Sequence, residues 1–282
     1  MKILGIDIGG TGIKGAIVDT ETGELLSDRL RIPTPKPATP ERIANELKTF
    51  IEQFKWKGPV GISFPTVIKN GKAMQYGNLD KSWQYTQVDA LFKTKTGYDF
   101  YIVNDADAAA MGVMEFGVGK NQMGLVITIT LGTGIGSGVF FNGQLLSNFE
   151  LGRMYGRKGD IMEAFAADSA RKREEWSFKA WAKRVNFFLN HVEKSFNPDL
   201  IIIGGGAMGS AFTIPCLENN NKVTITEPYS KRFIKDLSSK KKFHTALKIK
   251  LPKKLRFRNF PSIAFFSEIT VGSVGLKFGQ LV

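Results

Sequence analysis

The chain has 282 residues, a net charge of +13 and a hydrophobic content of 43%. This composition predicts a globular protein with a large core, and no apolar run is long enough for a transmembrane helix. One cysteine, Cys216, excludes an internal disulfide and a cysteine-built zinc site. The sequence enters an apolar run at Ile3, so we expect no signal peptide, no membrane partner and a cytoplasmic location.

Most of the positive charge lies in one segment. Residues 222–258 contain 13 lysines and arginines against two acids, Glu227 and Asp236, and so carry +11 of the total. A segment of this kind favours a polyanion, such as nucleic acid, polyphosphate or membrane headgroups. A solvated, lysine-rich insertion explains it as well, and both interpretations stay open.

In the first half of the chain, alternating apolar runs and turn residues predict an α/β lobe. The expected elements are strands at 3–8, 13–18, 25–32, 60–64 and 101–103, a helix that starts at Pro40 with Thr39 as N-cap, and a helix at 106–116. Asp105 lies where a strand ends and a helix begins, which is a usual ligand position in open α/β sheets. Asp105 is therefore a candidate general base, with a helix N-cap as the alternative.

The second half predicts a similar scheme. The expected elements are a hairpin at 125–141, a long helix at 178–196, a buried strand at 200–203 and a closing helix at 268–282. The strand at 200–203 runs into three glycines, residues 204–206. Three glycines after a strand permit close approach of a nucleotide or a phosphate chain, although a tight turn explains them equally well.

A glycine-rich turn occurs in both halves, 122 residues apart. Gly10-Thr11-Gly12-Ile13 and Gly132-Thr133-Gly134-Ile135 each lie between two apolar runs, so each predicts strand, tight turn, strand. Glycines tolerate positive φ and let an anion approach the backbone amides. Two copies indicate a duplicated lobe with two phosphate-binding loops.

The two turns differ in their acidic residues. The first has Asp7 three residues before its glycine, where the second has Ile129. We therefore expect a carboxylate at the first turn only, which suits a single magnesium ion held through water. The Walker pattern is absent, so a P-loop enzyme is excluded.

Four motifs occur together in this chain, and their combination resembles the ROK family of sugar kinases. They are Asp7–Lys14, Asn104–Ala108, Leu131–Gly136 and Glu150–Gly152. The resemblance implies an α/β fold of the actin-like, hexokinase-like type, a duplicated ribonuclease H-like fold with two lobes and a central cleft. It implies a small lobe at 1–107, completed by the C-terminal helix at about 263–282, and a large lobe at 108–262 with a basic insertion at about 218–260.

Further segments are similar to the polyphosphate glucokinases within this family, namely Ile32–Glu41, Gly77–Trp83 and the helix that contains Trp181. This similarity implies transfer of a phosphoryl group from polyphosphate, with ATP as a second possible donor, to the 6-hydroxyl of glucose. It also implies Mg²⁺, a homodimer and no nucleic-acid partner. The alternatives are an ATP-dependent ROK hexokinase for a related sugar and a weakly active sugar-binding relative. A sugar-responsive regulator is disfavoured, because the first strand begins at Ile3 and leaves no room for a DNA-binding domain.

The resemblance assigns roles position by position. Asp105 is similar to the general base, and Asp7 to a magnesium ligand. The positions similar to sugar-binding residues are Asn78, Asp80, Asn104, Glu150, Arg153 and Glu163. The positions similar to phosphate- or nucleotide-binding residues are Asp7, Gly9, Gly10, Thr11, Gly12, Lys14, Gly132, Thr133, Gly134, Gly204, Gly205 and Gly206.

Two departures from the family pattern matter. Arg153 stands where the family has histidine after Glu-x-Gly, and arginine only donates hydrogen bonds whereas neutral histidine also accepts them. This change is expected to alter sugar binding. The cysteine cluster that holds zinc in typical members is also missing, so no zinc site is expected.

Overall fold

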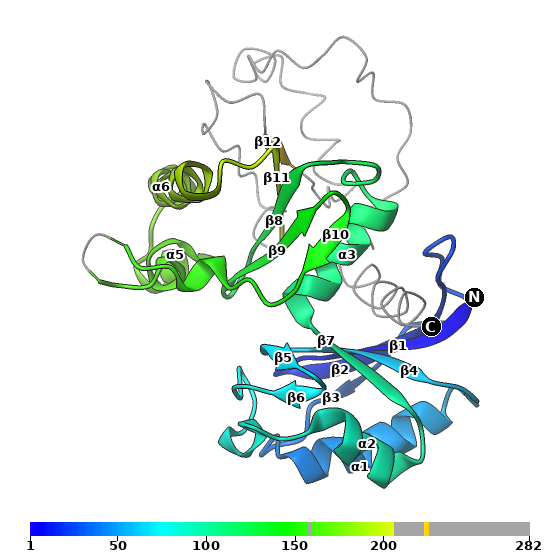
Figure 1. Ribbon diagram of the computed structural model, residues 1–282. Coiled ribbons are helices and arrows are strands. Elements are labelled where there is room, and N and C mark those ends of the chain that lie inside the picture. Colours follow the sequence, from blue (N-terminus) through cyan, green and yellow to red (C-terminus); the bar gives the residue numbers. More distant parts are fainter. Residues whose placement is uncertain (157–158, 206–222, 226–282) are drawn as a thin grey trace, which may run out of the picture. The chain divides into compact units, whose positions relative to one another are not determined.

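The structure is a computed structural model that describes residues 1–156, 159–205 and 223–225 (Figure 1). Its contacts divide the chain into two compact units. In the described residues, unit 1 holds 1–122 and 138–149, and unit 2 holds 123–137 and the residues from 150 onward. The predicted closing helix, Gly206 and nearly all of the basic segment lie outside the described residues. The lobe boundary at residue 107 stays a prediction.

The first sheet belongs to unit 1 and has the strand order β3-β2-β1-β4-β7. The hairpin of β1 and β2 and the pairing of β2 with β3 are antiparallel, whereas β4 is parallel to both β1 and β7. The strands are β1 (Lys2–Ile8), β2 (Gly12–Asp19), β3 (Leu30–Pro33), β4 (Val60–Phe64) and β7 (Phe100–Asn104).

The predicted third strand at 25–32 is too long. β3 begins at Leu30, and Leu25 makes only an isolated bridge with Val18. The Ser27 hydroxyl accepts a hydrogen bond from the Ile17 amide at 2.9 Å. In a regular sheet, the Ile17 amide would donate to a backbone carbonyl of the neighbouring strand. Because it donates to the Ser27 side chain instead, the β-sheet hydrogen bonding is interrupted between the Val18–Leu25 bridge and β3.

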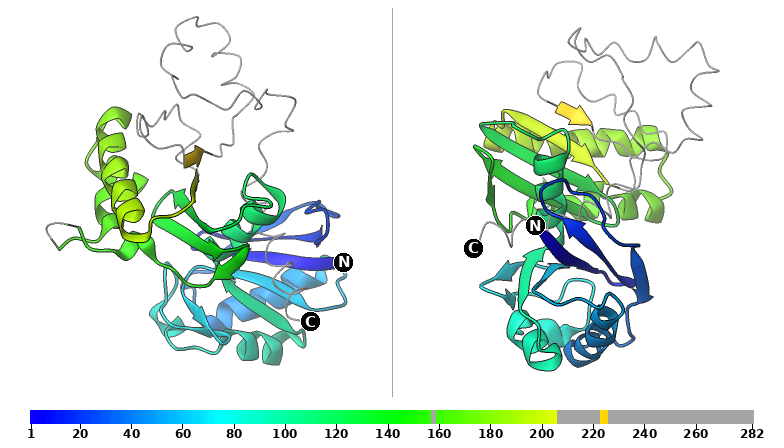
Figure 2. Two further views of the ribbon diagram at one scale, coloured as in Figure 1. Left: turned by 45° about the horizontal axis from the view of Figure 1, so that its top comes forward. Right: turned by 90° about the vertical axis from the view of Figure 1, so that its right-hand side faces the viewer.

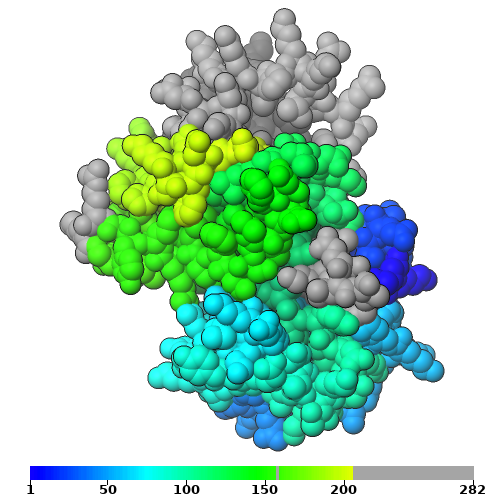
Figure 3. Space-filling view, viewed as in Figure 1, coloured from blue at the N-terminus to red at the C-terminus, as the bar shows by residue number. Residues whose placement is uncertain are grey.

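Two helices cover one face of the first sheet (Figures 1 and 2). They are α1 (Pro40–Glu52) and α2 (Val88–Thr96). The Thr39 hydroxyl caps α1 by accepting from the Arg42 amide, as predicted. Leu47 and Phe50 of α1 are fully buried in the core with the sheet. The short strands β5 (Ile68–Lys69) and β6 (Lys72–Ala73) lie next to α2, and these three elements form one continuous surface in Figure 3.

The second sheet has the order β10-β9-β8-β11-β12. β9 and β10 are antiparallel, and β11 is parallel to both β8 and β12. The strands are β8 (Leu125–Leu131), β9 (Ile135–Phe141), β10 (Gln144–Leu146), β11 (Leu200–Gly204) and β12 (Val223–Ile225). The two sheets repeat the same arrangement, with a hairpin and a third strand at one edge and two parallel strands at the other. The predicted duplication is confirmed.

The remaining described helices carry the site residues and their supports. They are α3 (Asp105–Phe116) in unit 1, and α4 (Met162–Ala166), α5 (Asp168–Arg173) and α6 (Phe178–Phe196) in unit 2. Short 3₁₀ helices are η1 (Lys81–Trp83) and η2 (Leu151–Arg153). The predicted aromatic face of α6 is core, since Trp181 and Phe188 are fully buried. Among the described helices, none is long and apolar enough to cross a membrane.

Candidate active site

The first glycine turn joins β1 to β2 in unit 1. The Gly9 amide donates to the Gly12 carbonyl at 3.0 Å, which closes the turn. Within the described part of the chain, no acceptor lies on the amides of Gly10 and Thr11. Neighbouring amides that face the same concavity form an anion site. The predicted tight turn is confirmed, and its geometry suits a phosphate group.

Asp7 lies directly across the hairpin from Lys14. Its Oδ2 pairs with Lys14 Nζ at 3.1 Å, and its Oδ1 accepts from the Ser63 hydroxyl at 3.0 Å. An ionised carboxylate has about four acceptor positions, so the contacts with Lys14 and Ser63 leave room for a metal-bound water. In the described residues, no three or more acidic, histidine or cysteine side chains lie together in a way that could hold a metal ion. This donor set fits a magnesium ion that takes most of its ligands from water and phosphate.

The loop at 77–83 lies against the first glycine turn. A Cβ added to Gly10 would lie 3.2 Å from the Asn78 carbonyl oxygen, so the two backbones are in close contact. Asp80 is the N-cap of η1, and its Oδ1 accepts from the amide of Ser82 at 2.9 Å and from the Ser82 hydroxyl. These hydrogen bonds lower the pKa of Asp80 below its ordinary value. The exposed Asn78 thus lies beside the turn, and Asp80 follows it two residues later in the same loop.

Asn104 and Asp105 occupy the carboxyl end of β7 and the start of α3. The Asn104 Oδ1 accepts from the amides of Ala106 and Asp107 at 2.9 and 3.1 Å. Asn104 is therefore the N-cap, and the interpretation of Asp105 as the cap is wrong. Asp105 is the first helical residue and is exposed, and its Oδ1 accepts from the Ala106 amide at 2.9 Å. The cap uses the side-chain oxygen of Asn104, and the exposed carboxylate of Asp105 follows it in the chain.

Asp107 is a buried acid that sequence reasoning did not single out. It is 1% exposed, and its Oδ2 accepts from the Asn148 amide at 2.8 Å. The Asn148 side chain in turn pairs with both backbone groups of Ile68, at 3.0 and 2.9 Å. This network ties the start of α3 to β5. The signal in the sequence was a second acid two residues after Asp105, on the helix face that turns inward.

The second glycine turn joins β8 to β9. The Gly132 amide donates to the Gly134 carbonyl at 3.0 Å, so the predicted tight turn is confirmed here too. The Ile135 amide donates to Glu163 Oε2 at 2.9 Å, and a Cβ added to Gly134 would contact that carboxylate. The expectation of a carboxylate at the first turn only is wrong. Glu163 reaches the second turn from α4, 28 residues away in sequence, where local motif spacing gives no sign of it.

Glu150, Arg153 and Glu163 gather in unit 2. Arg153 Nε lies 3.5 Å from Glu150 Oε2, with Arg153 half exposed. Burial raises the pKa of Glu150, Arg153 lowers it and the charge of Glu163 raises it, with a net upward shift. An acid paired with a cation, with a second acid close enough to raise its pKa, can bind the hydroxyls of a sugar, because carboxylates accept hydrogen bonds and the guanidinium donates them.

Two glycines of unit 2 are required by close backbone approach. A Cβ on Gly152 would lie 2.5 Å from the Ile135 carbonyl oxygen. The adjacent Leu151 amide donates to the buried Ser137 hydroxyl at 3.0 Å, so this segment packs tightly against β9. Gly205 follows Gly204 at the end of β11 with φ of +110°, and its Cα faces the backbone of Leu131. Gly152 therefore fixes where Glu150 and Arg153 lie.

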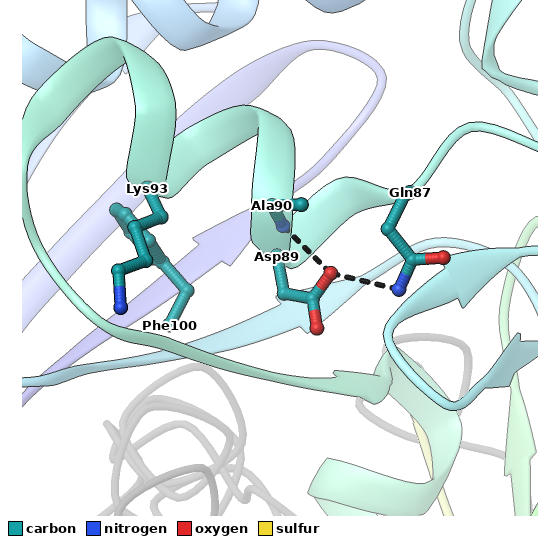
Figure 4. A pocket seen from close by; sticks show the side chains of 5 residues that line it. All are labelled: Gln87, Asp89, Ala90, Lys93 and Phe100. Carbon is teal, nitrogen blue, oxygen red and sulfur yellow. Dashed lines mark hydrogen bonds between the residues drawn. The ribbon is translucent and has the colours of Figure 1, made fainter.

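A depression on α2 contains none of these residues (Figure 4). It is lined by Gln87, Asp89, Ala90, Lys93 and Phe100. Asp89 is already engaged there by Gln87 Nε2 and by the Ala90 amide, at 2.9 and 2.6 Å. The chemistry of the candidate site lies at the turns and strand ends instead.

Residues 3–155 match the ROK family. The chain belongs to this family. It is 42% identical over 221 residues to the polyphosphate glucokinase of Mycobacterium tuberculosis strain H37Rv, and the match covers 78% of this chain and 83% of that protein. The predicted family is confirmed.

Solved structures of sugar kinases are similar to this chain as well. The inorganic polyphosphate/ATP-glucomannokinase of Arthrobacter sp. strain KM has a TM-score of 0.79 and 32% identity, with 100% of this chain and 99% of that chain covered. A ROK family glucokinase from Streptomyces griseus, in complex with glucose and AMPPNP, has a TM-score of 0.61 and 23% identity, covering 74% and 84% of the two chains. The predicted fold class is confirmed.

Proposed function

We propose that this ROK protein is a polyphosphate-dependent glucokinase that transfers a phosphoryl group to the 6-hydroxyl of glucose. The observation that carries the proposal is the 42% identity to curated polyphosphate glucokinases over 83% of their length. The site chemistry agrees with it, because one unit presents free turn amides and cations and the other presents acids suited to sugar hydroxyls.

Phosphoryl transfer needs alignment, charge neutralisation and a group that takes the proton of the acceptor. Asp105 is the base for the 6-hydroxyl, supported by its exposed carboxylate at the end of β7. Asn104, Asn78, Asp80, Glu150, Arg153 and Glu163 hold the sugar. The amides of the two glycine turns hold the donor phosphates, together with Lys14. Gly204, Gly205 and Gly206 serve the nucleotide when ATP is the donor.

Magnesium completes this proposal. Asp7 holds the ion through water, since its two oxygens keep acceptor capacity beside Lys14 and Ser63. Bound there, the ion neutralises charge on the donor phosphates. Lys14 holds the Asp7 carboxylate in place through its contact at 3.1 Å and adds its own positive charge to the site.

The donor and the assembly are also part of the proposal. Polyphosphate and ATP both act as donors, in line with the Arthrobacter neighbour, whose name includes both. The enzyme acts in the cytoplasm as a homodimer. The alternative of an ATP-dependent hexokinase is kept because the chain is also similar to a glucokinase of Streptomyces coelicolor, at 34% identity over half of this chain.

A coupled assay of glucose 6-phosphate formation tests the proposal. Initial rates are measured for the full chain with glucose, Mg²⁺ and either long-chain polyphosphate or ATP. Turnover with polyphosphate supports the proposed function. Turnover with ATP alone identifies the hexokinase alternative, and glucose binding without turnover identifies a sugar-binding relative.

A further inference from the structure

The carbonyl side of the first glycine turn is covered by one segment of unit 1. We call this segment, residues 31–42, the arm. It runs from β3 into α1. Three successive turn carbonyls, at Gly9, Gly10 and Thr11, accept side-chain hydrogen bonds from the arm. The donors are Thr34 Oγ1, Lys36 Nζ at 2.9 Å and Arg31 Nη2 at 3.2 Å.

The cations of the arm retain free donor capacity. A lysine ammonium has three donors and an arginine guanidinium has five. Lys36 and Arg31 use one each on the turn, and Arg42 donates to the Lys36 carbonyl at 2.7 Å. All three side chains are exposed, and in the described residues none of them forms an ion pair with a carboxylate. Their charge is therefore available to an anion next to the open amides of Gly10 and Thr11.

The arm is also held rigid. Prolines at 33, 35, 37 and 40 restrict its backbone. Thr34 is 4% exposed, and its hydroxyl anchors the arm to Gly9. At the far end, the Ala38 carbonyl accepts from Trp83 Nε1 at 2.7 Å and from the Asp80 amide at 3.4 Å. Cations fixed in this way lose little conformational entropy when a ligand binds.

We infer that Arg31, Lys36 and Arg42 form a track for a linear polyanion, which extends the phosphate site of the first glycine turn outward along the arm. The inference rests on the proposed function, because the polyanion is the inorganic polyphosphate donor beyond its terminal phosphates. A short donor fills the turn and reaches few of the three cations. A long chain, with about one charge per phosphate, reaches all of them.

The experiment compares two triple variants of the full chain. R31Q/K36Q/R42Q removes the track, and K48Q/K57Q/K69Q removes three exposed lysines of the same unit that do not contact the turn. Binding of fluorescent long-chain polyphosphate is measured without glucose, over a range of salt concentrations. Tripolyphosphate and a single-stranded oligonucleotide serve as competitors.

Loss of three charge contacts should weaken long-chain binding about tenfold and reduce the slope of log Kd against log salt by about 2. The affinity of R31Q/K36Q/R42Q for tripolyphosphate should fall less than about threefold. The control variant K48Q/K57Q/K69Q should bind long-chain polyphosphate as the wild type does. Equal losses in both triple variants, equal losses for long and short polyphosphate, or a matching loss for the oligonucleotide would overturn the track. So would an unchanged affinity.

Two further measurements keep the test decisive. R31K/R42K retains the charges and should retain most of the affinity, and K36Q alone should show part of the loss if the triple variant does not fold. Because binding is measured without turnover, it does not depend on phosphoryl transfer. Failure of the track with intact polyphosphate-driven turnover refutes only this inference, whereas absent turnover with intact binding refutes the proposed function.

Discussion

The two glycine turns have the same backbone plan and opposite surroundings. The first is covered by cations, with Lys36 and Arg31 on its carbonyls and Lys14 beside Asp7. The second has acids around it: Glu163 accepts a hydrogen bond from the Ile135 amide, and its charge raises the pKa of Glu150. Duplication of a turn therefore did not duplicate its chemistry. Segments that arrive from elsewhere in the chain decide what each turn can bind.

The largest effect is expected for Asp105, the proposed general base in unit 1. Asp105→Asn keeps the size of the side chain and removes the proton acceptor, so kcat should fall about 10²–10⁴-fold while glucose still binds. Kinetics with a saturating donor, with calorimetric titration of glucose, check this outcome. Asp99→Asn, at an exposed acid of the same unit, is the control. A variant that keeps more than a tenth of the wild-type kcat would remove Asp105 from this role.

A smaller effect is expected for Glu163→Gln at the second turn, which should change KM for glucose rather than KM for the donor. Glu163→Gln retains an oxygen that can accept from the Ile135 amide, so the turn is kept while the charge is lost. Charged hydrogen bonds are about 1 kcal/mol stronger than neutral ones, which corresponds to a rise of about fivefold in KM for glucose. Steady-state kinetics in both substrates measure it.

Glu174→Gln, at an exposed acid on the same unit, is the matched control for this prediction. If Glu163→Gln raises KM for the donor instead, the second turn serves phosphate and the contrast between the turns is wrong.

A still smaller effect should follow at Arg153. Arg153→His frees Glu150 Oε2 from its cation at 3.5 Å and adds a group that can accept as well as donate. KM for glucose should fall about two- to threefold above neutral pH, a change typical of one exposed polar contact. Arg173→His is the control. A rise in KM would show that arginine at position 153 binds the sugar better than histidine does.

The finest test uses pH. Arg153 lowers the pKa of Glu150 against the upward effects of burial and of Glu163. Removing its charge in Arg153→Gln therefore raises that pKa further, so Glu150 becomes protonated at higher pH. The acid limb of kcat/KM for glucose should move to higher pH, and the limb for the donor should stay in place. Movement to lower pH would contradict the assigned electrostatics.

The sequence predicted what local pattern determines. The hairpins, the Thr39 cap, the buried face of α6 and the place of Asp105 all follow from periodicity, turn residues or strand ends. Their duplication was visible because both turns keep their glycines. The ROK motifs added the family, which the matches confirm. The roles of the site residues stay predictions.

Long-range contacts were not predictable in this way. Glu163 reaches Ile135 across 28 residues, and Asp107 holds Asn148 across 41. Periodicity and spacing describe one element at a time, so they give no sign of which loop covers which turn. The error at 25–32 has a local cause, since Ser27 replaces a backbone partner that strand propensity assumes.

The double acceptance by the Ala38 carbonyl has a practical consequence for protein engineering. Because Trp83 and Asp80 both donate to that one oxygen, the arm and the loop at 77–83 are not separate modules. Transplanting the arm alone into an ATP-specific relative would leave Ala38 without its partners and the cations without a fixed position. A transfer of donor preference therefore has to move both segments together.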